Sequence, residues 1–351
     1  MKPVTTEADR SDPRDYLDQL ARRLSHHCAT YKEPITGRAL AQLANTLTPF
    51  LALSAAVLWF AIEGWWALAL LLALPAGALL VRLFIIQHDC GHGSFLHSRK
   101  ANDRTGRILS LLTITPYDSW KRAHAVHHAS TGDLSRRGTG DIFTLTVREY
   151  RALGPWGRLR YRLYRNPLVL VGLGSPFNFL VLQRLPFGRG LPWRESWRDV
   201  KLLNLALAAV YGGLAYWIGI GPALLSILPT VCVAAWIGGW LFYVQHQYED
   251  TVWESGEDWG FHRAALGGSS YYVLPRLLQW LTGNVGLHHI HHLNSRIPNY
   301  RLQECLEGYP LLAEVGRLSL KQSLQCARLA LWDEEARKLV PIAGAYPGPA
   351  T

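Results

Sequence analysis

The sequence predicts an all-α membrane protein in which four transmembrane helices, paired as two hairpins, carry a helical cap on the cytoplasmic side. Three observations support this fold class. Hydrophobic residues make up 49% of the 351 residues and charged residues only 18%, against roughly 25% charged in typical soluble domains. Two pairs of long apolar segments are each joined by a short turn, and basic residues gather between the pairs.

The first hairpin is expected over residues 47–62 and 65–86. The first of these segments is almost wholly apolar and ends at Glu63-Gly64, and the second is apolar except for Arg82 near its end. A spanning helix needs about 20 apolar residues, so this pair is predicted to cross the membrane twice with a very short outer turn. Arg82 lies where its long stem can carry the charge to the membrane surface.

The second hairpin is expected over residues 202–220 and 222–244, again with a short uncharged turn. The segment between the hairpins, residues 87–201, holds 19 of the 36 Lys and Arg residues. Because basic residues concentrate in cytoplasmic loops, both termini and this segment are predicted on the cytoplasmic side, of the inner membrane in a bacterium. An apolar stretch at 168–182 is interrupted by Gly and Pro and is predicted to be interfacial or re-entrant.

This topology divides the chain into three parts. They are a cytoplasmic N-terminal arm at 1–42, a membrane domain at 43–310, and a cytoplasmic C-terminal helix and tail at 311–351. The formal net charge of +10 fits contact with anionic membrane lipids, and because no nucleic-acid recognition motif is present, no nucleic-acid partner is expected. Five Cys residues without a CxxC pair argue against a disulfide framework and against an iron–sulfur cluster.

Nine of the fourteen His residues fall into three tight clusters. On a helix, residues at i, i+3 and i+4 share one face. The i, i+4 pair of the first cluster and one i, i+3, i+4 triplet in each of the other two therefore present eight imidazoles on three helix faces, with His289 pointing elsewhere. The eight residues are His88, His92, His124, His127, His128, His288, His291 and His292.

The number of these imidazoles indicates a site for two metal ions in the cap, since eight are too many for one tetrahedral zinc ion. With four spans, all three clusters lie on the same side of the membrane and can converge. Imidazole binds Zn, Cu, Fe and Ni, so ligand type alone does not decide the metal. Two Fe ions are the choice on chemical grounds, because a paired nitrogen-rich site beside lipid suits the activation of O2 and of unreactive C–H bonds.

Four segments resemble the membrane fatty acid desaturase family, and most closely its methyl-end Δ12/ω6 acyl-lipid branch. They are HDCGHGSF at 88–95, SWKRAHAVHH at 119–128, FYVQHQYED at 242–250 and GNVGLHHIHHLNSRIPNYRL at 283–302. The similarity in motif order and spacing covers most of the membrane domain. The resemblance implies an oxidoreductase that desaturates fatty acyl lipids with O2 at a non-haem di-iron centre, with an apolar acyl tunnel and an external electron donor of the ferredoxin or cytochrome b5 type.

Carried over by position, the family's metal ligands fall on the same eight His residues and on a further His after the fourth span. In this sequence the further ligand matches His246. In acyl-CoA members of the family, an Asn one helical turn before that His holds a water molecule on one metal. The corresponding residue here is Phe242, so this chain departs from the family pattern at one coordination position.

Polar residues near the motifs are candidates to hydrogen-bond the imidazoles and fix their tautomers. They are Asp89, Asp141, Glu249, Asp250, Asn284 and His289. For each carboxylate, a helix-cap or surface role stays open. The remaining His residues are expected to be ordinary interfacial residues: His26, His27, His97 and His262. A basic surface that could attract an acidic donor or lipid headgroups is formed by Lys121, Arg122, Arg136 and Arg137.

The motifs leave two alternatives open. An acyl or carotenoid hydroxylase or ketolase of the same superfamily differs by only a few residues around the same metals. A His-rich metal transporter belongs to a different class, but transporters place their sites near the bilayer midplane. The His clusters of this chain lie at or beyond the ends of the predicted spans, which favours the enzyme.

Overall fold

The computed structural model describes residues 13–138, 140–185 and 192–346; the predicted terminal arm and tail lie partly outside these residues. Four of its helices are long and apolar enough to cross a membrane, which confirms the predicted fold class. They are α2 (Thr36–Ile62), α3 (Trp66–His92), α9 (Trp193–Ile218) and α10 (Ile220–His246). At 1.5 Å per residue each is about 40 Å long, so each extends past its predicted apolar segment into the polar layer of a bilayer.

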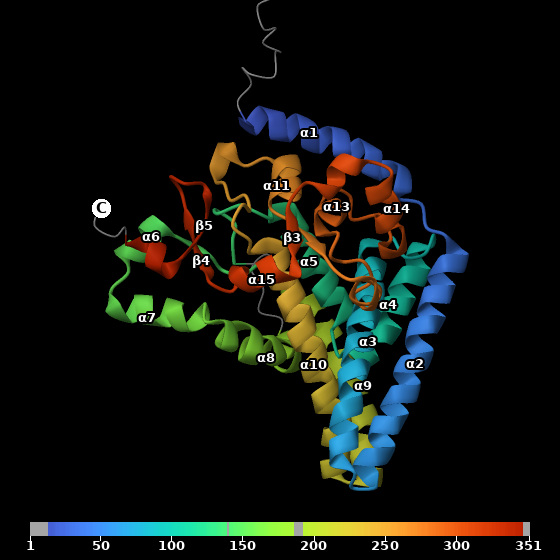
Figure 1. Cartoon of the computed structure of the whole chain (residues 1–351). Coiled ribbons are helices and arrows are strands. Elements are labelled where there is room, and N and C mark those ends of the chain that lie inside the picture. Colours follow the sequence, from blue (N-terminus) through green and yellow to red (C-terminus); the bar gives the residue numbers. More distant parts are fainter. Residues whose placement is uncertain (1–12, 139, 186–191, 347–351) are drawn as a thin grey trace, which may run out of the picture.

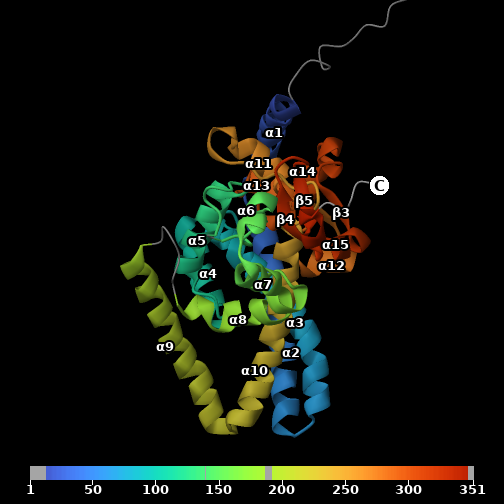
Figure 2. The ribbon, with the colours of Figure 1, turned by 90° about the vertical axis from the view of Figure 1, so that its left-hand side faces the viewer.

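The four long helices form one end of the molecule, and the shorter elements gather as a head at the other end (Figure 1). α3 packs against both α2 and α10, and 61% of its most apolar stretch is buried inside the protein. α9 leans away from α10 beyond their shared turn, so that the two helices form a V (Figure 2). Only 6% of the corresponding stretch of α9 is buried, which makes α3 the central helix and α9 the one most exposed to lipid.

Both hairpins turn on a glycine in the left-handed conformation, Gly64 at a φ of 80° and Gly219 at a φ of 88°. Gly219 is the single residue between α9 and α10, and a side chain there would be strained. Trp65 and Trp217 beside the two turns are well exposed. Exposed Trp is typical of the membrane–water interface, so both turns are expected to lie at the membrane surface opposite the head.

The head consists mainly of short helices that cover the ends of α3 and α10. They are α1 (Pro13–Cys28), α4 (Arg99–Thr113), α5 (Tyr117–Ser130), α11 (Phe261–Gly267), α12 (Arg276–Leu281), α13 (His288–Leu293) and α14 (Leu302–Glu307), with short turns η2 (Ala29–Tyr31), η5 (Gly256–Asp258), η6 (Asn299–Arg301) and η7 (Pro310–Ala313). Leu20 and Leu24 of α1 belong to one buried cluster with Ile290 and Leu293 of α13. The first helix of the chain thus packs over the helix that carries the third His cluster.

A second layer of helices lies across the base of the head rather than along the spans (Figure 1). It contains α6 (Val147–Ala152), α7 (Pro155–Tyr164), the π-helical turn η3 (Leu168–Leu173), α8 (Gly174–Leu180) and η4 (Leu182–Arg184). α7 and the following helical segment are bent by 59° relative to each other. An odd number of crossings between the first and third His clusters would place them on opposite sides of a membrane, whereas the structure brings them together, so four crossings fit the structure better than five.

Two small sheets complete the head, and the sequence did not predict them. β1 (Leu145–Thr146) pairs in parallel with β4 (Leu329–Asp333), which pairs antiparallel with β5 (Lys338–Pro341). β2 (Tyr271–Val273) pairs in parallel with β3 (Arg317–Ser319). The C-terminal region therefore contains a short helix, α15 (Leu320–Cys326), and η8 (Ile342–Ala345), but also three strands. β1 and β2 pair with this region, so the C-terminal segment is joined to the rest of the head.

Candidate metal centre

The three predicted His clusters converge in the head, together with His246 at the end of α10. Their ring nitrogens form two groups, and within each group one nitrogen per residue lies within 4.8 Å of all the others. Group A consists of His88, His92, His124, His128 and His291. Group B consists of His127, His246, His288 and His292. The two groups are adjacent, since the rings of His128 and His292 stack with their centroids 4.2 Å apart.

The local helix geometry explains how each cluster contributes to the groups. α3 ends directly after His92 because Gly93 adopts the left-handed conformation and caps the helix. On α5, His124 and His128 point into group A, whereas His127 points into group B. On α13 the division is reversed, with one imidazole in group A and two in group B. Each triplet shares one broad helix face, as predicted, but supplies ligands to two neighbouring sites.

The nitrogen–nitrogen distances within each group are short enough for shared metal binding. In group A the Nε2 atoms of His88 and His124 are 3.0 Å apart, and the pairs His124–His128 and His128–His291 are both at 3.1 Å. In group B the Nε2 atoms of His246 and His288 are 3.0 Å apart. Two nitrogens bound at about 2.1 Å to one ion would be separated by about 3.0–3.4 Å. Several imidazoles of each group could therefore bind one ion.

Burial supports the same conclusion. The Nε2 atom of His92 and both ring nitrogens of His127 are buried without a hydrogen-bond partner among the described residues, and buried polar atoms are normally paired. A network of hydrogen-bonded neutral rings would leave these atoms unexplained, whereas a metal ion in each group would use them. Burial, reinforced by neighbouring imidazoles, holds the pKa of His127 and His292 well below the usual value, so these rings are neutral and have a lone pair to donate.

Two imidazoles are oriented by hydrogen bonds from their other nitrogen. Nδ1 of His246 donates to the carbonyl oxygen of Gly268 at 2.8 Å, which leaves the lone pair on Nε2 inside group B. Nδ1 of His88 lies 3.1 Å from Oδ1 of Asp89. The other carboxylate oxygen of Asp89 accepts from the backbone N–H and the side-chain amide of Asn299, at 2.6 and 2.8 Å. Such partners fix the tautomer and the ring orientation of metal-binding His residues.

The other polar candidates do not bond the imidazoles of the two groups. Asn284 donates to the backbone oxygen of Asn299, and the exposed Glu249 pairs with Lys338. Asp250 is exposed, and Asp141 accepts a backbone N–H from Gly138. His289 lies outside both groups and bonds the carbonyl oxygen of Leu312. Four further His residues, predicted to be ordinary interfacial residues, also lie outside both groups: His26, His27, His97 and His262.

Phe242 packs against group B, one helical turn before His246. Its ring centroid is 5.4 Å from the ring centroids of both His127 and His246. An aromatic ring there offers no ligand atom and excludes water from that side of the group. Where acyl-CoA members of the family have a polar Asn, this chain therefore has the apolar ring of Phe242.

The four basic residues predicted to form an attracting surface are each paired with an acidic side chain. The pairs are Lys121 with Asp103, Arg122 with Asp199, Arg136 with Asp133 and Arg137 with Glu149. Their positive charges are therefore locally compensated.

Two residues of the site, Asn299 and His246, could not be found from the spacing of the His residues. His246 has no other His near it in the sequence, and only the motif around it predicts its role.

The fold and the site define a mainly helical membrane protein with two adjacent groups of buried and half-buried imidazoles, each able to hold a metal ion. The chain belongs to the fatty acid desaturase family, whose family model matches residues 63–316. The chain is therefore an enzyme, and the predicted family is confirmed.

Curated relatives support the same assignment. A protein of Bacillus subtilis named fatty acid desaturase is 40% identical over 91% of this chain and 90% of its own length. Two proteins of Synechocystis are each 28% identical. One is named sn-1 acyl-lipid omega-3 desaturase (ferredoxin) and is covered over 73% of this chain and 71% of its own length. The other is named sn-1 oleoyl-lipid 12-desaturase and is covered over 65% and 64%.

Proposed function

We propose that this enzyme introduces a double bond into the acyl chains of membrane lipids, toward the methyl end in the Δ12/ω6 manner, with O2 as oxidant. The observation that carries the proposal is the pair of adjacent imidazole groups, which use nine His residues from four helices, six of them buried and three half-buried. The names of the Synechocystis relatives, which refer to acyl-lipid and oleoyl-lipid substrates, support a lipid-bound acyl chain as the substrate.

Two Fe ions are the proposed cofactor, one in each group. Group A offers five imidazoles and group B four, and all nine, including His246, are the proposed ligands. Bound iron would supply the redox chemistry with O2 that acid–base side chains lack. The protein's own contribution is to hold the rings neutral and oriented, through burial and through the bonds of His88 and His246 described above.

The head is proposed to face the cytoplasm, with the four long helices as a multi-pass anchor in the inner membrane of a bacterium. The excess of basic residues in the segment between the hairpins supports this orientation. The layer formed by α7, η3 and α8 is proposed to lie in the plane of the membrane surface. Large apolar side chains along it are exposed, among them Trp156, Leu168, Leu173 and Phe177, and a helical layer with such a face suits the interface.

Electrons are proposed to come from a separate protein. The name of one Synechocystis relative includes ferredoxin, which supports a donor of that kind; a cytochrome b5-type donor is the alternative. Because the four basic residues considered above are already paired with carboxylates, recognition of the donor is not assigned to them.

The lipid profile of an expression host tests the proposal. In a host that lacks polyunsaturated lipids, we expect the chain to produce acyl chains with one additional double bond, detected by gas chromatography–mass spectrometry. Metal analysis of the purified protein should give two tightly held Fe ions per chain. An oxygenated acyl or carotenoid product without a new double bond would identify a hydroxylase or ketolase instead, and readily exchanged zinc would identify a metal transporter.

The variant His127→Ala tests the site assignment. We expect desaturation to fall by more than about 100-fold, because loss of a ligand exceeds the 10–100-fold cost of losing an outer partner, and iron in group B to be lost. His97→Ala is the matched control, since His97 is exposed and outside both groups. Full iron content and activity in His127→Ala would show that the second cluster is misassigned.

A further inference from the structure

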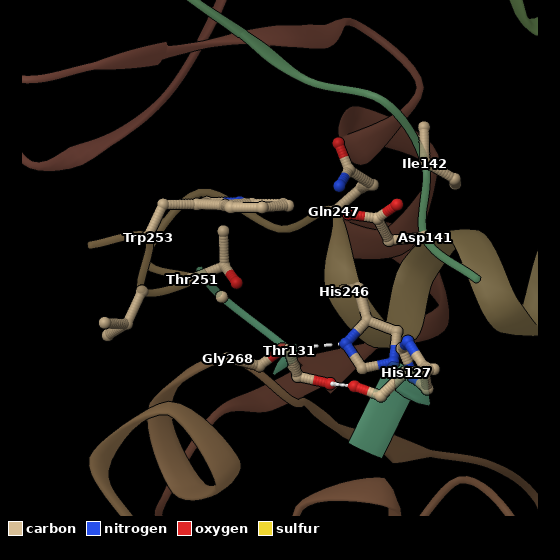
Figure 3. A pocket seen from close by; sticks show the side chains of 11 residues that line it. His127, Thr131, Asp141, Ile142, His246, Gln247, Thr251, Trp253 and Gly268 are labelled. Atoms are coloured by element: carbon tan, nitrogen blue, oxygen red, sulfur yellow. Dashed lines mark hydrogen bonds between the residues drawn. The ribbon is translucent and has the colours of Figure 1, made fainter. Parts of the chain in front are cut away.

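A small cavity lies beside group B, between the end of α10 and the loops that follow α5 and α10 (Figure 3). His127 and His246 line one side of it. Asp141 and Val252, which also line it, are partly exposed, so the cavity reaches from the two imidazoles toward the protein surface. Its volume is about 10 Å³, which is enough for roughly one water molecule.

Two residues that line the cavity each carry a buried hydrogen-bond donor that has no partner among the described residues. The two donors are the side-chain amide nitrogen of Gln247 and the indole nitrogen of Trp253. Gln247 is fully buried and Trp253 is 5% exposed. Buried N–H groups without a partner are rare because they lose their hydrogen bonds to water on folding. The position of both donors at one cavity points to a ligand there that accepts hydrogen bonds.

The orientation of the Gln247 amide is fixed by Arg165. The guanidinium of Arg165, which is buried, donates to Oε1 of Gln247 at 2.7 Å and to the carbonyl oxygen of Leu329 at 2.9 Å. Its other acceptors among the described residues are the hydroxyl of Thr144 and the carbonyl oxygen of Phe143, so none of its hydrogen bonds there goes to a carboxylate. Because the amide oxygen of Gln247 accepts a hydrogen bond from the cationic side chain of Arg165, the amide nitrogen must take the other position, on the side of the cavity.

Asp141 supplies an acceptor at the same place. One of its carboxylate oxygens accepts the backbone N–H of Gly138 at 2.7 Å, and Figure 3 shows the carboxylate between Gln247, Trp253 and the ring of His246. Two N–H donors and one carboxylate around a space of one water volume match the two to four hydrogen bonds that a buried water makes. These polar groups can therefore hold one water molecule within an otherwise largely apolar lining.

We propose that this cavity holds a water molecule through which protons pass from the solvent to group B, with Asp141 as the proton-carrying group and Gln247 and Trp253 as the residues that position the water. The inference rests on the proposed function. In that reaction O2, two hydrogen atoms from the acyl chain, two electrons and two protons give the double bond and two water molecules. The two protons must enter the buried centre from solvent, and group B has this polar route beside it.

The route also accounts for the apolar wall on the other side of group B. Phe242 covers the two imidazoles on the side of α10, whereas Asp141 and Gln247 line the cavity side. Group B thus has a cavity on one side and an aromatic ring on the other. The arrangement supplies protons without wetting the apolar side.

Substitutions at Asp141 test the proton role. In Asp141→Asn we expect unchanged iron content and thermal stability, at least about a tenfold lower rate of desaturation, and more peroxide released per double bond, because reduced oxygen escapes and is protonated in bulk solvent. Asp141→Glu should restore much of the rate. Glu257→Gln is the matched control, since Glu257 is exposed and outside the cavity. An Asp141→Asn enzyme with wild-type rate and coupling would overturn the proton role.

Substitutions at the donors test the water site without removing the packing. Gln247→Glu keeps an acceptor for Arg165 but replaces the cavity-facing N–H group, and Trp253→Phe keeps an aromatic ring in the cluster with Trp332 and Leu339. We expect both variants to fold, bind iron and release more peroxide per double bond. Wild-type coupling in both variants would overturn the positioning role.

An experimental structure of the iron-loaded enzyme provides a readout that does not depend on activity. We expect density for a water molecule within hydrogen-bond distance of Gln247 Nε2 and the Asp141 carboxylate, and loss of this density in Gln247→Glu together with Trp253→Phe. A dry cavity in the wild-type enzyme would overturn the inference alone. A wild-type enzyme that makes no double bond would overturn the proposed function, and the proton role with it.

Discussion

α3 and α9 have nearly the same length and are both apolar enough to cross a membrane, yet they occupy very different surroundings. Most of the apolar stretch of α3 is buried between its neighbours, whereas hardly any of that of α9 is buried. α3 ends in three buried polar residues, Gln87, His88 and Asp89, and each has a hydrogen-bond partner elsewhere in the head. The length of an apolar segment predicts that it spans the membrane, whereas the buried polar residues near the end of α3 fix the position of this helix in the fold.

The largest expected effect comes from breaking the close approach of α3 to α10. A Cβ atom on Gly77 would lie 2.5 Å from a side-chain carbon of Val233 and 3.0 Å from the backbone oxygen of Thr230. Gly77→Leu should therefore separate the two helices and prevent recovery of folded, iron-loaded protein in detergent. Gly212→Leu on α9 meets nothing within 4 Å and should be tolerated. Equal yields of the two variants would contradict the central position of α3.

A smaller effect is expected from removing side-chain volume. Leu83 on α3 is fully buried, so Leu83→Ala should lower the free energy of unfolding by about 2–5 kcal/mol through lost contacts and a residual cavity. Leu205 on α9 is well exposed, so Leu205→Ala should change the free energy of unfolding by less than about 0.5 kcal/mol. Thermal unfolding of the two purified variants measures the difference. A similar loss in both would mean that α9 packs against a neighbour in the membrane.

The smallest of these effects concerns the hydrogen bond from Asn299 to Asp89, which holds the end of α3 in position. Asn299→Ala removes the amide that donates to Asp89, the partner of His88. We expect iron affinity in group A to fall by about 10–100-fold, measured by competition with a chelator, while group B keeps its ion. Asn204→Ala is the control on α9, because Asn204 bonds Arg184 and no residue near the metals. Loss of both ions, or of neither, would show that Asn299 does not act through His88.

Much of the fold and of the metal centre could be predicted because the signals are local. Apolar length identified the spans, and His spacing identified eight of the nine members of the two groups. The divided triplets, such as His127 against His124 and His128, could not be predicted, since the division depends on how α5 and α13 face each other. The small sheets could not be predicted because strands of two to five residues form only through pairing with other segments, as Leu145 pairs with Leu331 and Tyr271 with Arg317.

The contact that orients the Gln247 amide at the cavity could not be predicted for a related reason. Arg165 and Gln247 lie 82 positions apart, and although Gln247 stands within the motif at 242–250, nothing in the sequence links it to Arg165. Their contact depends on the head bringing the end of α10 against the segment after α7. Long-range polar contacts of this kind leave no periodic pattern in a sequence, although they decide which side of an amide faces the site.

Because each His triplet supplies ligands to both groups, insertions and deletions of residues affect the metal centre differently in different parts of the chain. One inserted or deleted residue within α5 would rotate the imidazoles that follow it by about 100°, and so displace ligands of both groups in a single event. The same holds for α13. By contrast, the turn around Gly64 stands at the far end of the spans and touches neither group. A change of length within either helix therefore disturbs both ion sites at once, whereas a substitution of one side chain can affect a single site.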